Sequence, residues 1–123
     1  MKKFGTALTG LIACISLSGA FAQEFPEGAT AVADNDLKKR ISDTVFDVKL
    51  ADGVTWRLEY KSNGFFFVDT SRGFRGDGKW SIDNGKLCGQ LRGRDHSCNE
   101  LRLVRDILHM KRDSGEIVQL IPR

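Results

Sequence analysis

The chain has 123 residues, with 19 lysines and arginines against 16 aspartates and glutamates, and a formal net charge of +3. Its length suits one domain rather than two. Without the two lysines at its start, 17 basic residues face 16 acidic ones, and this balance argues against a general binder of nucleic acids or other polyanions.

Residues 1–22 have the pattern of a secretory signal peptide. Lys2 and Lys3 give a basic start, residues 4–21 are uncharged and mostly apolar, and Ala20-Phe21-Ala22 has the small-x-small form of a cleavage site. The apolar run is short for a membrane span and has no basic flank. We therefore predict cleavage between Ala22 and Gln23, a periplasmic or secreted mature chain, and no stable membrane span in that chain.

A second export signal overlaps the first. Residues 11–14 (Leu-Ile-Ala-Cys) fit a bacterial lipobox, in which Cys14 would be lipidated and anchored to a membrane. The apolar core before Cys14 is weak, and the apolar stretch continues beyond it, so simple cleavage is favoured. A lipoprotein anchored through Cys14 remains the alternative.

Residues 23–35 are small, acidic and aperiodic, which predicts a flexible N-terminal segment. The acidic and amide side chains of residues 34–36 offer a helix N-cap, and Leu37 and Ile41 fall on one face of the turn that follows. We expect one short helix at about 36–42, at the start of a single β domain spanning 36–123.

From residue 44 onward the pattern is that of β-strands. Asp-Gly and Asn-Gly at residues 52–53, 63–64 and 84–85, and Ser-Gly at 114–115, indicate hairpin turns. Short connections make sequential strands antiparallel neighbours. The fold class is therefore mainly β, an up-and-down meander of about eight strands that forms a small barrel or a strongly curled sheet. The expected strands are 44–51, 54–61, 65–70, 78–83, 86–92, 98–105, 107–112 and 116–121.

Two cysteines, Cys88 and Cys98, remain after the predicted cleavage, and two cysteines in an exported chain normally pair. Alternation places Leu87 and Leu101 toward the core, so both cysteines face outward on adjacent strands. A turn centred on Gly93 puts them directly opposite each other, within disulfide range.

Several short motifs resemble functional sites. Residues 95–97 (Asp-His-Ser) hold the residue types of a catalytic triad, but neighbours in a turn cannot align for that chemistry. Residues 75–77 (Arg-Gly-Asp) match an adhesion tripeptide, although a Gly-rich turn is favoured. Residues 65–67 (Phe-Phe-Phe) suit either the wall of a ligand cavity or, more commonly, a core strand.

The longest connection, residues 71–77, is the predicted binding loop. It combines two glycines with Arg72, Phe74 and Arg75, and arginine and aromatic side chains carry much of the energy in binding sites. We predict that these three residues contact a partner. The alternative position is a basic outer face around Arg92, Arg94 and Arg102.

Residues 78–88 (Gly-Lys-Trp-Ser-Ile-Asp-Asn-Gly-Lys-Leu-Cys), followed by Cys98, resemble a known pattern. This pattern is the Gly-x-Trp, Gly-x-Leu-Cys and Cys core of small exported proteobacterial proteins catalogued as domain of unknown function 995. The resemblance covers roughly residues 44–120. It implies a periplasmic, lipocalin-like small barrel or half-barrel and supplies no catalytic residues.

The leading hypothesis is an uncharacterised exported binding module whose partner is a small apolar ligand or an envelope protein. The alternative is an inhibitor of an envelope-targeting hydrolase such as lysozyme. Nothing in the sequence brings Asp69, Asp77 or His109 to a common cleft, so no enzymatic activity is predicted. No cofactor is predicted, and no metal site, because His96 and His109 are the only histidines and no third thiol remains.

Overall fold

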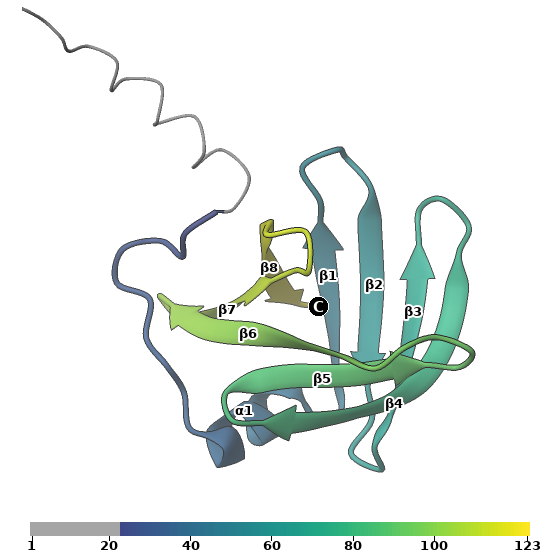
Figure 1. Ribbon diagram of the computed structural model, residues 1–123, viewed down its shortest axis with the longest axis horizontal. Coiled ribbons are helices and arrows are strands. Elements are labelled where there is room, and N and C mark those ends of the chain that lie inside the picture. Colours follow the sequence, from purple (N-terminus) through teal and green to yellow (C-terminus); the bar gives the residue numbers. More distant parts are fainter. Residues whose placement is uncertain (1–22) are drawn as a thin grey trace, which may run out of the picture.

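The computed structural model describes residues 23–123, which form one helix and eight strands (Figure 1). The predicted signal peptide, Ala22 at its cleavage site and the alternative lipidation site Cys14 lie outside the described residues. Helix α1 spans Asp34–Ile41. The strands are β1 Thr44–Lys49, β2 Thr55–Tyr60, β3 Phe65–Thr70, β4 Arg75–Asp83, β5 Lys86–Leu91, β6 Ser97–Val104, β7 Ile107–Lys111 and β8 Ile117–Pro122.

Each strand pairs antiparallel with the next, and β8 returns to β1, so the sheet is a closed barrel. This confirms the mainly β meander and decides between the barrel and the curled sheet. Four of the turns contain a glycine at positive φ where the sequence predicted one: Gly53, Gly64, Gly85 and Gly115. Glycine adopts this conformation without the steric cost that a Cβ brings.

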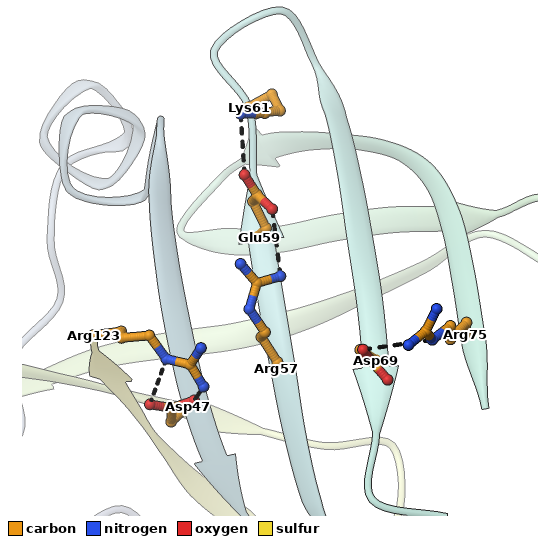
Figure 2. A network of polar contacts seen from close by, with 7 residues as sticks. All are labelled: Asp47, Arg57, Glu59, Lys61, Asp69, Arg75 and Arg123. Carbon is orange, nitrogen blue, oxygen red and sulfur yellow. Dashed lines mark hydrogen bonds and ion pairs between the residues drawn. The ribbon is translucent and has the colours of Figure 1, made fainter. Parts of the chain in front are cut away.

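The barrel closes through a short seam between β1 and β8. Only two residue pairs are in register there, Phe46 with Pro122 and Asp47 with Ile121. The backbone N–H of Arg123 donates to the carbonyl of Val45 at 2.8 Å, just beyond the strand. The side chain of Arg123 then pairs with Asp47 (Figure 2). A closed sheet has no exposed edge strand.

Alternation along the strands directs one side chain of every two into the barrel. At one end, Tyr60 stacks on Phe66 with ring centroids 5.5 Å apart and meets the edge of Trp80, also at 5.5 Å. Helix α1 covers this end, where Leu37 and Ile41 are fully buried. The three aromatic rings and the two helix residues therefore belong to one buried core.

The start of α1 differs from the expected one. The helix begins at Asp34 rather than near residue 36, and its N-cap is Ala33, which makes no side-chain cap. The carboxylate of Asp34 instead accepts hydrogen bonds from the backbone N–H groups of Asn84, at 3.0 Å, and Gly85, at 2.8 Å. These bonds fix the helix to the β4–β5 turn, beside which it lies in Figure 1.

Residues 23–33 run along the outside of the barrel. Thr30 forms a two-way backbone bridge with Leu103 in β6, and Gln23 donates to the carbonyl of Gly115. The guanidinium of Arg102 lies 5.4 Å from the ring of Phe25. These contacts attach residues 23–33 to the barrel at several points, whereas composition alone predicts a flexible segment there. No helix within the described residues is long and apolar enough to cross a membrane.

Candidate functional site

The barrel contains a cavity of about 760 Å³ that opens at the end away from α1. Side chains from most of the strands line it, together with the β3–β4, β5–β6 and β7–β8 connections. Most of the wall is apolar: Val54, Trp56, Leu58, Phe66, Val68, Leu87, Leu91 and Met110. A concave, largely apolar space of this size is typical of a small-molecule site.

Three glycines shape the inner face of β4 and β5, and one of them, Gly89, lines the cavity. Gly76, Gly78 and Gly89 stand in register with the inward-facing residues Val68, Phe66 and Trp80, respectively, of the neighbouring strands. A Cβ on Gly89 would come within 3.2 Å of the Phe66 ring, and one on Gly76 within 3.1 Å of the Phe74 ring. On Gly78 it would lie 2.0 Å from the carbonyl oxygen of Gln90. The absence of side chains at these positions thus sets where the aromatic rings and β5 lie.

Polar side chains also line the cavity, besides the three arginines at its mouth: Thr70, Asp95, His96, Ser97, Asn99, Asp113 and Ser114. The amide of Asn99 donates to the carboxylate of Asp113 at 2.8 Å, and the Thr70 hydroxyl accepts from the backbone N–H of Phe74. Tyr60 lines the cavity and is only 5% exposed. Its hydroxyl has no hydrogen-bond partner among residues 23–123, and burial raises its pKa. A buried hydroxyl without a hydrogen-bond partner is unfavourable, and a polar atom of a bound ligand would provide that partner.

The mouth of the cavity carries cationic groups on aromatic rings. The guanidinium of Arg94 lies 4.8 Å from the ring centroid of Phe74, and that of Arg112 lies 4.9 Å from the centroid of Trp56. All four residues line the cavity. Arginine over an aromatic face is a favourable contact that also fixes the orientation of the guanidinium.

The predicted binding loop is shorter than expected. Residues 75–77 belong to β4, and the connection is a tight turn over 71–74, closed by a hydrogen bond from the N–H of Thr70 to the carbonyl of Phe74. The expectation of a Gly-rich turn at residues 75–77 is therefore wrong. The error arose because Gly76 and Gly78 remove the apolar alternation that marks a strand.

The three predicted binding residues separate into two groups. Arg72 and Phe74 line the cavity mouth. Arg75 lies on the outer face, where its guanidinium is 3.6 Å from the carboxylate of Asp69 (Figure 2). The structure thus brings two of the three to one site. Whether they contact a partner stays a prediction.

The alternative basic face also divides. Arg92 pairs with Asp77 at 2.6 Å, and Arg102 pairs with Glu100, both outside the cavity lining. Arg94, in contrast, is at the cavity mouth. The sequence suggests grouping Arg94 with Arg92, because the two are close in the chain. The position of Arg94 beside the β3–β4 connection depends on the folding of the barrel, which the local sequence does not show.

Asp69, Asp77 and His109 do not meet. Both aspartates pair with arginines outside the cavity lining, and His109 stands in register with Arg102 and Gln119 of the neighbouring strands. None of the three lines the cavity. The expectation of no enzymatic activity stays a prediction.

The disulfide is as predicted. Cys88 and Cys98 are paired in register on β5 and β6, with Cα atoms 3.9 Å apart, and their sulfurs are bonded. Ser81, in register with Cys88 on its other side, is exposed, as expected for the outer face, but Cys88 itself is only 2% exposed and lines the cavity. A ligand atom of His96 lies within 4.8 Å of both sulfurs, but the disulfide occupies the thiolates that a metal would need.

The three successive phenylalanines alternate across the sheet. Phe66 is buried and lines the cavity, whereas Phe65 and Phe67 lie on the outer face and are 39% and 41% exposed. Phe66 is therefore both a core residue and part of the cavity wall. The ammonium of Lys79 lies 5.7 Å from the Phe65 ring and covers part of it.

Comparison of the chain with protein-family models, with curated proteins and with solved structures gives no match. The resemblance to domain of unknown function 995 therefore stays a prediction.

Proposed function

We propose that this protein is an exported binding module that holds a small, largely apolar molecule inside its barrel. The observation that carries this proposal is the cavity of about 760 Å³, which is lined mainly by apolar and aromatic side chains. Pockets that enclose small molecules commonly have volumes of about 300–1,000 Å³. Helix α1 covers one end of the barrel, so a ligand enters and leaves at the other.

The surrounding scaffold supports this function. The cavity lies in a closed, hydrogen-bonded barrel and is lined by β2, β3, β5, β6 and β7, and the disulfide joins β5 to β6. A preformed site loses less conformational entropy on binding than a mobile one. The signal-peptide pattern and the disulfide both support export, because disulfides persist in oxidising compartments.

A neutral fluorescent probe, N-phenylnaphthylamine, tests the proposal, since its emission rises when it enters an apolar site. We expect saturable binding at one site per chain. Val68 lines the cavity, so Val68→Trp should fill part of it and abolish most of the binding. Val45 stands in register with Glu59, outside the cavity lining, so Val45→Trp is the matched control and should bind like the wild type. Equal binding by both variants would place the probe outside the barrel.

The alternative, an inhibitor of an envelope-targeting hydrolase such as lysozyme, stays a prediction. The expected plugging loop is the four-residue turn at 71–74, which offers little surface. Full lysozyme activity in the presence of excess protein would remove lysozyme as the target.

A further inference from the structure

The chemistry of the cavity mouth points to a class of ligand, and this inference rests on the proposed function. Three guanidinium groups line the cavity, those of Arg72, Arg94 and Arg112. They differ in their acidic neighbours. Arg112 pairs closely with Glu116 and stacks on Trp56, so its charge is already neutralised.

Arg72 and Arg94 have weaker ion pairs than Arg112, or none. The guanidinium of Arg72 is 3.9 Å from the carboxylate of Asp52, at the limit of an ion pair, and its side chain is 73% exposed. Arg94 has no carboxylate within 4.0 Å among residues 23–123, and its guanidinium lies over the Phe74 ring. Arg94 is therefore the cavity-lining cation best placed to accept an anionic group.

The backbone holds Arg94 in place although its side chain is exposed. Its N–H donates to the carbonyl of Leu91 at 2.9 Å, and its own carbonyl accepts from the side-chain amide of Gln90 at 3.0 Å. The guanidinium itself packs over the face of the Phe74 ring. A cation fixed in this way loses little side-chain entropy when it binds an anion.

Two carboxylates also line the cavity. Asp113 accepts a hydrogen bond from Asn99, and Asp95 immediately follows Arg94 in the chain. Of the three guanidinium groups, Arg112 is paired with Glu116 and Arg72 lies near Asp52, whereas an anion at Arg94 meets a guanidinium with no carboxylate within 4.0 Å among residues 23–123. The charge arrangement thus favours an anion at Arg94.

We propose that the cavity binds an amphipathic organic anion, with its apolar part between the walls of the barrel and its anionic group at Arg94, assisted by Arg72. The guanidinium fork matches a carboxylate or a phosphate in a bidentate hydrogen bond. The apolar part contacts Trp56, Phe66 and Val68, and the hydroxyl of Tyr60 is available to a polar atom deep in the cavity.

Two matched probes separate this proposal from the general one. Anilinonaphthalenesulfonate differs from N-phenylnaphthylamine by its sulfonate group alone. We expect the anionic probe to bind the wild type more tightly, and its affinity to fall with added salt while that of the neutral probe stays constant. Displacement by decanoate, by decyl phosphate and by decylammonium then compares head groups on one chain length. Decanoate or decyl phosphate should displace the probe best, and the better of the two identifies the head group.

Arg94→Gln should weaken binding of the anionic probe by about tenfold and leave the neutral probe unchanged. Arg92→Gln is the control, because it makes the same change two residues away, on a side chain that pairs with Asp77 outside the cavity lining. Arg72→Gln should have a smaller effect, and Arg75→Gln none. Both test residues are exposed, so these variants should fold normally.

The outcomes are distinct. Binding of both probes with equal affinity, or best displacement by decylammonium, would overturn the anionic ligand while leaving the apolar cavity site intact. Equal losses in Arg94→Gln and Arg92→Gln would place the anion elsewhere and also overturn the proposal. Binding of neither probe would overturn the proposed function itself.

Discussion

The carboxylate of Asp47 accepts two hydrogen bonds from the guanidinium of Arg123, at 2.6 and 3.2 Å, across the seam where β8 meets β1 (Figure 2). The seam has only two residue pairs in register, so this ion pair adds to a short stretch of backbone pairing. The hydrogen bonds from Arg123 hold the pKa of Asp47 below its ordinary value. The pair thus joins the two ends of the meander.

Arg123→Gln should lower the midpoint of urea unfolding at pH 7. Because the folded-state pKa of Asp47 is depressed, its contribution is present above its ordinary pKa of about 4 and disappears as the pH falls through the folded value. The difference between variant and wild type should therefore shrink as the pH falls below about 4 and vanish once Asp47 is protonated in the folded protein as well. Arg75→Gln, which removes an exposed pair between neighbouring strands, should change the midpoint little. An Arg123→Gln difference that persists at low pH would argue against this electrostatic origin.

Replacing Cys88 and Cys98 together by serine should lower the free energy of unfolding by about 2–3 kcal/mol, because the loop that the disulfide closes gains freedom in the unfolded chain. Urea unfolding followed by tryptophan fluorescence measures the change. Wild type unfolded with a reductant should match the double variant. Two free thiols in protein purified without reductant would refute the pairing.

The single tyrosine of the chain allows a direct test of burial. Burial raises the pKa of Tyr60, so absorbance at the tyrosinate band should show no titration in the folded protein near the ordinary pKa of about 10. Since the unfolded chain ionises there and the folded chain does not, Tyr60 should make stability fall as the pH rises above about 10. Tyr60→Phe should remove that part of the loss. Titration at an ordinary pKa in folded protein would show that the hydroxyl is in contact with water.

Gly78→Ala should destabilise the barrel by about 1–3 kcal/mol, because the new Cβ would lie 2.0 Å from the carbonyl oxygen of Gln90 and push β5 away. Gly76→Ala is the comparison, since its Cβ would meet only the side-chain tips of Phe74 and Leu91, which can shift. Thermal unfolding of both variants measures the difference. The same loss in both would mean that the close backbone approach at Gly78 has no special cost.

We also predict that export removes residues 1–22 and adds no lipid. The new first residue would be Gln23, whose backbone nitrogen donates to Gly115 and whose side-chain oxygen accepts from the N–H of Ile117. Intact-mass measurement of the exported protein checks this. A diacylglyceryl adduct on Cys14 would show the lipoprotein alternative to be correct.

Much of the fold could be predicted from local signals. Asp-Gly and Asn-Gly turns located three of the hairpins, and the alternation around Leu87 and Leu101 gave the register that brings Cys88 opposite Cys98. These signals worked because turn geometry and strand parity depend on neighbouring residues only. The start of β4 was missed, since glycines at 76 and 78 leave no apolar alternation to read.

The candidate site was harder to predict. Arg94 and Phe74 come from different connections, and only closure of the barrel brings the guanidinium over the ring. The cavity itself depends on how all inward side chains fill the barrel, which no single segment encodes. Inward-facing glycines at 76, 78 and 89 were the one available signal, because glycine in a strand often marks a close approach.

The most direct test of the central claim is to locate the bound probe by NMR. Intermolecular NOEs should connect N-phenylnaphthylamine to methyl groups that line the cavity, those of Val68, Leu91 and Met110, and not to Val45, which lies outside the cavity lining. NOEs confined to Phe65, Phe67 and Val45 would instead place the probe on the outer face and contradict a ligand site inside the barrel.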